Sequence, residues 1–370
     1  MAASGDFKVK VFYTWGQAKG KVIDKDFGIE REWDIDLLSG YDHAFVQNTS
    51  SEPGSHHYKG IINPSLISEV KAFNPDKIIV YGWKFKSHLQ LMRHFKGKTP
   101  LYFRGDSTLL DDAAGFSIKK SLRRLLLQWV YGHVDFALSP GIASDEYFLT
   151  AGLTANQIVR APHAIDNERF SNPSDGNLSY REESLRWRSE LSISDESCVF
   201  LYAGKLQGLK NPELLIRSFL RLKLKYKDVF LVMVGNGELE NELKAKFSVE
   251  INHQSFLHFL PFQNQSMMPT IYRIGDVYVL PSNSETWGLA INEAMACGRP
   301  VIASDKCGAA ADMIKDNENG FVFKAGDEND LYNCMEKMLN ADLASMGASA
   351  QETVQHFSYA SFATALRSLA

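Results

Sequence analysis

The sequence predicts an α/β protein made of two doubly wound domains, and three observations support this. The chain has 370 residues, more than one hydrophobic core normally supports, since cores stop growing near ~250 to 300 residues. Short apolar runs rich in β-branched and aromatic residues alternate with helix-length segments, which is typical of parallel sheets covered by helices on both faces. After a polar segment, 171–180, this pattern starts again. We therefore expect one domain over residues 1–170 and a second over 171–354, with a last helix, 355–370, packing back onto the first.

The expected strands are short and lie in two sets. The first set comprises 9–13, 77–81, 100–103, 134–138 and 157–160, and the second comprises 198–203, 229–234, 256–260, 276–280, 301–304 and 320–323. In open parallel sheets ligands bind beyond the carboxyl ends of the strands, where loops enter helices. The loops after these strands are therefore the places to look for function.

Composition narrows the class of protein. Hydrophobic residues make up 45 % and charged residues 23 % of the chain, as in folded soluble proteins. A net charge of −4 argues against a protein that coats nucleic acid. The four cysteines form no C-x-x-C pair, and no apolar run approaches the ~20 residues that span a bilayer. We expect a cytoplasmic protein that holds no metal.

The densest signal is the segment DVYVLPSNSETWGLAINEAMACGRPVIAS, residues 276–304. It predicts a strand, a polar loop, a helix starting near Trp287 or Gly288 and ending at Gly298, and a second strand. A helix start in this place directs backbone N–H groups at an anion such as a diphosphate. Glu285 and Glu293 form an E-x7-E pair around the helix start, so each carboxylate could hold a different set of hydroxyl groups.

Two further loops add to this signal. Lys205 and Lys210 lie in AGKLQGLKNP, residues 203–212, before an expected helix over 212–224. Two ammonium groups there would offset the charge of a pyrophosphate without magnesium. The second loop, VGNGE over 234–238, follows the next strand, and its glycines allow close backbone approach. Either loop alone could be an ordinary solvated turn.

Together these motifs resemble the retaining glycosyltransferases of family 4, which have the GT-B fold of two Rossmann-like domains facing across a cleft. The resemblance rests on GKLQGLKNP, LVMVGNGELE, the 281–304 block, CGAAADMI-KDNENGFVF over 307–323, and APHAIDNERF over 161–170, where Ala164 replaces the usual glycine. It implies an enzyme that transfers a hexose from a nucleotide-sugar, with UDP-glucose or UDP-N-acetylglucosamine favoured. The acceptor would be a glycan or a lipid-linked sugar in polysaccharide biosynthesis, and no cofactor would be needed.

The resemblance also implies roles for single residues. Glu293 would bind the ribose hydroxyls and Glu285 the donor sugar, while Lys205, in place of the family's usual arginine, and Lys210 would bind the phosphates. The remaining donor contacts would come from backbone and side chains of the three loops, namely Gly204, Gly235, Asn236, Gly237, Thr286, Trp287, Gly288 and Leu289.

The first half departs from the family pattern. Its first loop, TWGQAKG over 14–20, is only partly glycine-rich, and we assign Gly16, Gln17 and Lys19 to acceptor binding. The strand 100–103 is followed by Arg104 and Asp106 where the family has a donor-contacting histidine. Arg104 and Asp106 are expected to contact sugar or acceptor, although a structural pair that caps the next turn fits equally well. His88 and His163 are weaker candidates.

The segment 117–131 has two dissimilar faces. Its cations Lys119, Lys120, Arg123 and Arg124 lie opposite the apolar residues Ile118, Leu122, Leu125, Leu126 and Trp129. This pattern fits peripheral contact with an anionic membrane face. A surface helix whose apolar side packs on its own sheet would have the same sequence pattern, and we favour that simpler interpretation.

Two other functions remain open. A nucleotide-sugar epimerase or a phosphorylase could use the same scaffold. A non-catalytic nucleotide-binding module would keep the glycine-rich loops but has no need for Glu285, Lys205 and Lys210 together. The Asp-x-Asp triplets at 24–26 and 34–36 lie early in the chain and indicate turns, not the metal site of a metal-dependent transferase.

Overall fold

The chain divides into two units. In the computed structural model, which describes residues 5, 7–16, 22–24, 29–31, 33–112, 117–172, 174–175, 178–253 and 256–369, unit 1 comprises Met1–Val22, Glu30–Pro162 and Ala363–Ala370. Unit 2 comprises Ile23–Ile29 and His163–Phe362. The boundary expected near residue 170 stays a prediction.

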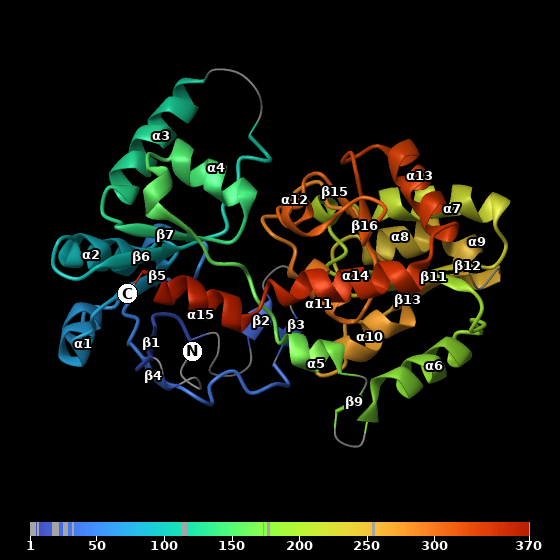
Figure 1. Cartoon of the computed structure of the whole chain (residues 1–370), viewed down its shortest axis with the longest axis horizontal. Helices are drawn as coiled ribbons and strands as arrows, with labels where there is room; N and C mark the ends of the chain where they lie inside the picture. Colours follow the sequence, from blue (N-terminus) through green and yellow to red (C-terminus); the bar gives the residue numbers. More distant parts are fainter. Residues whose placement is uncertain are drawn as a thin grey trace. The chain divides into compact units, whose positions relative to one another are not determined.

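Unit 1 contains a four-stranded parallel sheet in the order β5-β6-β7-β8 and a parallel pair, β1 with β4. Helices α3 (Ile118–Tyr131) and α4 (Ile142–Thr150) lie above the four-stranded sheet in the view of Figure 1, and α15 (Tyr359–Arg367) lies below it. The bounds from the amino terminus are β1 Lys10–Tyr13, β2 Val22–Asp24, β3 Ile29–Arg31, β4 Asp42–Phe45, α1 Leu66–Phe73, β5 Ile78–Tyr81, α2 Lys86–Phe95, β6 Leu101–Arg104, α3 Ile118–Tyr131, β7 Phe136–Ser139, α4 Ile142–Thr150 and β8 Ile158–Arg160.

The core of unit 1 joins the sheet to its helices. Phe103 of β6 packs edge-on against Tyr131 of α3 and Phe148 of α4, with ring centroids 5.1 and 6.0 Å apart. The end of the chain also belongs to this unit, because the carbonyl of Leu369 accepts hydrogen bonds from Lys77 Nζ at 2.9 Å and Tyr102 Oη at 3.3 Å. The last helix is thus tied to the start of the sheet.

Unit 2 is organised around a six-stranded parallel sheet in the order β13-β12-β11-β14-β15-β16. The bounds are α5 Asn167–Ser171, β9 Ser174–Asp175, β10 Leu178–Ser179, α6 Tyr180–Glu190, β11 Cys198–Ala203, α7 Pro212–Lys225, β12 Val229–Val234, α8 Glu240–Lys246, α9 Ser248–His253, β13 Leu257–Leu260, α10 Met268–Ile274, β14 Val277–Leu280, α11 Leu289–Ala296, β15 Val301–Ser304, α12 Ala310–Met313, β16 Gly320–Phe323, α13 Glu328–Leu339 and α14 Leu343–Gln355. Helix α15 begins in unit 2 and ends in unit 1.

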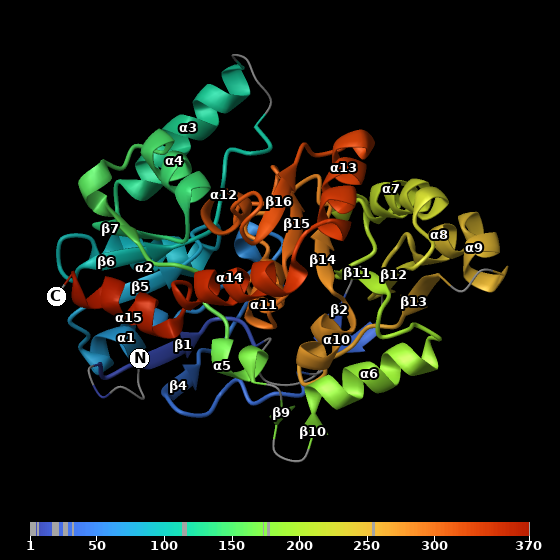
Figure 2. The same ribbon diagram turned by 45° about the vertical axis from the view of Figure 1, so that its right-hand side comes forward.

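Both faces of this sheet are buried, as the continuous apolar strands predict. Along β11, Val199 and Leu201 face the core beneath α10, α11 and α14, whereas Phe200 and Tyr202 face the core beneath α7 and α13. Alternate residues of a strand point to opposite faces, so an all-apolar strand requires helices on both sides. Figure 2 shows β14 to β16 between α7 and α13 on one side and α11 and α14 on the other.

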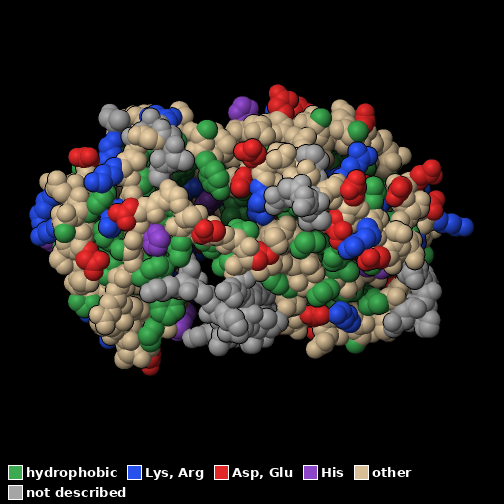
Figure 3. Space-filling model, turned by 90° about the horizontal axis from the view of Figure 1, so that it is seen from below, with side chains coloured by type: hydrophobic (Ala, Val, Ile, Leu, Met, Phe, Trp, Pro, Cys, Tyr) green, Lys and Arg blue, Asp and Glu red, His purple; other side chains and the backbone are tan. Residues whose placement is uncertain are grey.

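The surface agrees with the charge balance of the sequence. On the face shown in Figure 3, basic and acidic side chains are interspersed. Within the described ranges, no helix has the length and apolar content that crossing a membrane would require. All four cysteines are free thiols.

Candidate functional site

The strand order of unit 2 creates a switch point between β11 and β14. From β11 the chain continues to β12 and β13 on one side, and β14 begins the series that runs through β15 and β16 on the other. Ligands of open α/β sheets bind beyond the carboxyl ends of the strands at such a reversal. The loops 204–211 after β11 and 281–288 after β14 leave the two central strands at this point and carry the predicted residues.

Hydrogen bonds hold these two loops together. The backbone N–H of Asn283 donates to the carbonyl of Leu209 at 2.8 Å, and Asn211 Nδ2 donates to Asn283 Oδ1 at 3.1 Å. Asn211 is in the left-handed region, with φ of 50°, a conformation that asparagine tolerates better than most residues. It precedes Pro212, the first residue of α7, where proline suits a helix start.

Lys210 and Glu285 form an ion pair across the two loops. Lys210 Nζ donates to Glu285 Oε2, and the two side chains are only 20 % and 17 % exposed. Cys307 forms an isolated β-bridge with Glu285. Burial raises the pKa of its thiol to about 12, and the charge of Glu285 adds to this rise while that of Lys210 opposes it. The switch point therefore holds an ammonium group and a carboxylate in direct contact, both partly shielded from water.

Lys205 lies on the same loop as Lys210. Its side chain is half-buried, and its carbonyl accepts a hydrogen bond of 2.6 Å from the buried Tyr202 hydroxyl. Both lysines predicted to offset a diphosphate thus follow β11 on one short loop whose backbone is fixed to the sheet.

The glycines after β12 are required by the protein's own backbone. Gly235 has a φ of +133°, and a Cβ at this position would lie 2.0 Å from the carbonyl oxygen of Gly204. A Cβ on Gly237 would lie 2.1 Å from the carbonyl oxygen of Leu206, whose N–H bonds to the carbonyl of Asn236 at 3.0 Å. The glycines after β12 therefore allow the backbone of this loop to approach the backbone of the loop after β11.

The entry into α11 is a fixed turn. Gly288, at φ of +97°, precedes the first helical residue, Leu289. Trp287 is 3 % exposed, donates from Nε1 to Asn292 Oδ1 at 2.9 Å, and packs against the ring of His163 at 5.4 Å. Trp287 therefore anchors the start of the helix from inside, while Thr286 and Leu289 are exposed on either side of it.

Glu293 has a buried partner that the sequence did not indicate. The hydroxyl of Tyr272, on α10, donates to Glu293 Oε2 at 2.6 Å. Burial raises the pKa of Glu293, whereas the hydrogen bond from Tyr272 and the charge of Arg169 oppose that rise. Tyr272 is 1 % exposed and reads as an ordinary core residue in the apolar segment 268–274, so only its hydroxyl could have signalled this role.

The two glutamates share a neighbourhood. Burial raises the pKa of Tyr278, and the charges of both Glu293 and Glu285 add to the rise. The Tyr278 hydroxyl donates to the carbonyl of Ala203 at 3.2 Å, at the end of β11. The ring of Tyr278 also packs against Tyr272, the partner of Glu293, with centroids 5.5 Å apart. Tyr278 therefore connects the Glu293–Tyr272 pair with the start of the lysine loop, and the roles of the two glutamates stay predictions.

The candidates in unit 1 lie in varied settings. Arg104 is 4 % exposed, and its Nη1 donates to the carbonyls of Leu138, at 2.9 Å, and Ala161. These bonds tie the Arg104 side chain to the backbone of neighbouring segments. Its sugar contact and its pairing with the half-buried Asp106 both stay predictions, as does a sugar contact of Asp106. Gly16 is exposed, and Gln17 and Lys19 lie outside the described residues.

The two histidines have structural partners. His88 Nε2 lies 2.8 Å from Thr14 Oγ1, and its Nδ1 lies 3.0 Å from the carbonyl of Gly82. His163 packs on Trp287, and its carbonyl accepts a hydrogen bond from Asn292 at 3.3 Å. Both rings thus support loops that follow strands.

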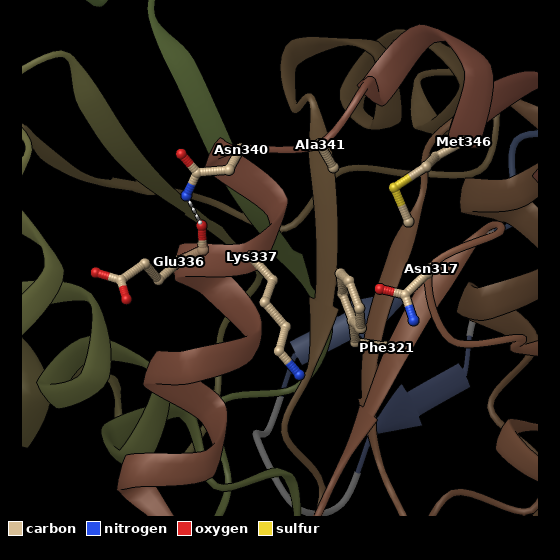
Figure 4. Close-up of a pocket in the computed structure, with 7 residues that line it drawn as sticks. All are labelled: Asn317, Phe321, Glu336, Lys337, Asn340, Ala341 and Met346. Carbon is tan, nitrogen blue, oxygen red and sulfur yellow. Dashed lines mark hydrogen bonds between the residues drawn. The ribbon is translucent and has the colours of Figure 1, made fainter.

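A separate hollow of about 340 Å³ lies elsewhere in unit 2. Figure 4 shows its lining residues, which include Asn317, Phe321, Lys337 and Asn340. Asn317 precedes β16 and Asn340 follows α13, so this hollow does not lie among the loops at the carboxyl ends of β11 and β14. Among the described residues, no group of three or more His, Cys, Asp or Glu side chains could hold a metal ion.

A family model matches the part of the chain that carries this geometry. Residues 183–355 match the family model described as glycosyl transferases group 1. This group 1 region covers just under half of the chain and includes both lysines and both glutamates of the site.

Several curated relatives carry names in the same class. A D-inositol 3-phosphate glycosyltransferase of Stackebrandtia nassauensis is 29 % identical over 192 residues, which is 50 % of this chain and 41 % of that protein. The sulfoquinovosyl transferase SQD2 of Arabidopsis thaliana is 24 % identical over 83 % of this chain and 58 % of its own length. The chain spans about half the length of the curated relatives it matches.

Solved structures agree on the fold. Anabaena Alr3699/HepE in complex with UDP has a TM-score of 0.68 at 18 % identity, covering 89 % of this chain and 86 % of that one. Sucrose-phosphate synthase from Thermosynechococcus elongatus has a TM-score of 0.67 at 18 % identity, covering 99 % and 89 %. The predicted GT-B class of two Rossmann-like domains is confirmed, and the comparisons agree with an enzyme of the glycosyltransferase class.

Proposed function

We propose that the protein is a retaining glycosyltransferase of family 4, which moves a hexose from a nucleoside diphosphate sugar to a glycan or lipid-linked acceptor. The observation that carries the proposal is the contact of Lys210 with Glu285 at the switch point. Glu293 is held by Tyr272, whose ring packs against Tyr278, and the Tyr278 hydroxyl donates to the start of the lysine loop. A nucleotide-sugar needs a cation for its diphosphate and acceptors for the hydroxyls at both ends, and these residues supply all three.

Lys205 and Lys210 would bind the diphosphate. An ammonium group in contact with a carboxylate, both largely shielded from water, is already oriented, so a phosphate oxygen can join it at small reorganisation cost. As the bond between the sugar and the diphosphate breaks, negative charge grows on the departing oxygen, and the two lysines stabilise it. We therefore infer that the reaction proceeds without a metal ion.

The glutamates would bind the two ends of the donor. Tyr272 occupies Oε2 of Glu293, which leaves Oε1 to accept hydrogen bonds from ribose hydroxyls. Glu285 would lie toward the sugar, where its charge can steady positive character at the reacting carbon. Retention means that the acceptor oxygen bonds to this carbon on the face that the diphosphate leaves.

A UDP-sugar is our choice of donor, with glucose or N-acetylglucosamine as the sugar. Structural neighbours include Anabaena Alr3699/HepE in complex with UDP-glucose, which supports this choice, and a starch synthase IV from Arabidopsis thaliana bound to ADP and acarbose. Since the likeness to both is one of fold, the nucleotide must be tested. We place the enzyme in polysaccharide synthesis and expect it to work in the cytoplasm.

Product analysis tests the proposal against its competitors. The protein is incubated with UDP-glucose labelled in the sugar, with and without a mixed glycan and glycolipid acceptor fraction, and with UDP-N-acetylglucosamine, ADP-glucose and GDP-mannose in parallel. A transferase releases label from the nucleotide in proportion to acceptor. Conversion of the sugar without acceptor indicates an epimerase, and release that requires inorganic phosphate indicates a phosphorylase; either result overturns the proposal.

A further inference from the structure

Helix α3 of unit 1 presents a row of large apolar side chains to solvent. The exposed fractions are 72 % for Ile118, 62 % for Leu122, 61 % for Leu125, 48 % for Leu126 and 48 % for Trp129. These positions recur at the three- and four-residue spacing that places side chains on one side of a helix. Contiguous exposed apolar surface of this kind marks an interaction site in a soluble domain.

Other residues of α3, in its last turns and on the side away from the apolar row, pack into the core of unit 1. Leu127, Val130 and Tyr131 are buried in the core of unit 1. The simpler expectation, in which the apolar row packs on the protein's own sheet, is therefore wrong, because different residues make that contact. Figures 1 and 2 both show α3 at the outer edge of its unit, beyond the sheet and beside α4.

Every charged side chain of α3 is basic. Residues 118–131 include Lys119, Lys120, Arg123 and Arg124 and no acidic residue. Arg123 pairs with Asp112 at 3.5 Å, with the two side chains 57 % and 40 % exposed. Exposed pairs of this kind contribute little, so the pair is easily exchanged for another anion.

Trp129 adds a residue suited to an interface. Its ring is about half exposed, and the guanidinium of Arg93 lies 6.0 Å from its centroid. Tryptophan favours the boundary between hydrocarbon and water because its ring is apolar and its N–H is polar. The apolar row therefore ends in a side chain that prefers the depth of lipid headgroups.

We propose that α3 docks on the surface of a bilayer that contains anionic phospholipids. The apolar row enters the headgroup and acyl boundary, and the long stems of the lysines and arginines carry their charges up to the lipid phosphates. A second copy of the chain is the poorer occupant, because a symmetric contact brings the same patch of both copies together and this helix has no acidic residue to pair with the cations of its copy. An anionic bilayer supplies the negative charges that a second copy of the helix lacks.

Vesicle flotation tests this proposal, independently of any catalytic activity. The full chain is mixed at low salt with vesicles of phosphatidylcholine alone or with 30 % phosphatidylglycerol. We expect at least tenfold more protein to float with the anionic vesicles, and 0.5 M NaCl to remove most of this difference. The double variant L122N/L125N removes apolar surface at exposed positions and should lower binding at least tenfold, while K119Q/R124Q should lower it mainly on anionic vesicles.

The matched control is L224N. Leu224 is 89 % exposed on α7 and stands between Lys223 and Lys225, so it offers the same residue types on a different surface; this variant should float like the wild type. Unfolding temperatures show whether each variant keeps its fold. Equal binding of L122N/L125N and wild type overturns the proposal, as does a wild type that floats with neither vesicle. Self-association in sedimentation that L122N/L125N abolishes, without flotation, assigns the row to a second copy instead.

Discussion

Replacement of Tyr272 by phenylalanine tests the geometry of the candidate site more sharply than removal of a charge. The substitution keeps the buried ring and deletes only the hydroxyl that donates to Glu293 Oε2 at 2.6 Å. Hydrogen bonds to charged groups contribute about 1.5 to 3 kcal/mol, and each 1.4 kcal/mol is a factor of ten in affinity. If Glu293 binds ribose only while Tyr272 holds it, nucleoside diphosphate affinity should fall about ten- to a hundredfold.

The dependence on pH provides a second readout, which loss of packing alone would not alter. Burial raises the pKa of Glu293 and the Tyr272 hydroxyl opposes that rise, so Y272F should raise this pKa further. Because ribose hydroxyls donate to the ionised carboxylate, affinity should be lost on acidification at a higher pH in the variant than in the wild type. The stability contribution has the opposite sense, since a raised carboxyl pKa favours the folded state at low pH and this benefit is lost as pH rises.

A similar pair elsewhere in unit 2 supplies the control. The Tyr332 hydroxyl donates to Glu336 Oε1 at 2.8 Å within α13, so Y332F removes the same chemical bond away from the switch point. Isothermal titration with UDP from pH 5 to pH 8 compares the three proteins. Equal affinities and equal pH profiles for Y272F and wild type would refute the assignment of Glu293 to nucleotide binding.

Three further predictions follow from the same loops. Lys210→Met should lower turnover by about a hundred- to a thousandfold, as removal of one preorganised donor does in other enzymes. The surface variant Lys246→Met should keep the turnover of the wild type, and a loss below tenfold in Lys210→Met contradicts the role of Lys210. Gly235→Ala should destabilise the protein by about 2 kcal/mol or more, because its Cβ would meet the Gly204 carbonyl at 2.0 Å. Denaturant unfolding measures this loss. Gly208→Ala is the neutral control, because a Cβ at Gly208 meets nothing within 4 Å. Sugar transfer should persist within about twofold in EDTA, since the lysines offset the diphosphate; a requirement for added Mg²⁺ would contradict this.

Much of unit 2 was predictable because its strands are buried on both faces. The expected runs 198–203, 229–234, 301–304 and 320–323 coincide with β11, β12, β15 and β16. A strand with apolar residues at every position would expose apolar side chains to water if either of its faces lay at the surface. Composition alone therefore marks these strands as buried. Gly298 is left-handed, with φ of +70°, as a helix-ending glycine should be.

The contacts within the site were harder to foresee. The sequence placed Lys210 and Glu285 on separate loops, and only the reversal of strand order between β11 and β14 brings them into contact. Tyr272 escaped notice because a tyrosine in an apolar helix looks like core until its hydroxyl partner is known. Such pairings depend on tertiary packing between segments that are distant in the chain.

Two further segments have contacts that their sequence patterns do not fix. Arg104 follows a predicted strand at its carboxyl end, where a ligand contact is expected, yet β6 extends through it and its guanidinium binds neighbouring carbonyls. For α3, sequence periodicity fixes which residues share a side of the helix but not which side meets the sheet. The structure decides that question by burying Leu127, Val130 and Tyr131.

The most direct test of the central claim is the affinity of the protein for diphosphates compared with nucleosides. Isothermal titration with UDP, ADP and GDP, each beside its nucleoside, should show one nucleotide that binds at least a hundredfold more tightly than its nucleoside. This preference should disappear in the double variant K205M/K210M. A protein that binds none of the three diphosphates, or a double variant that keeps the full preference, would contradict a diphosphate site at the switch point of unit 2.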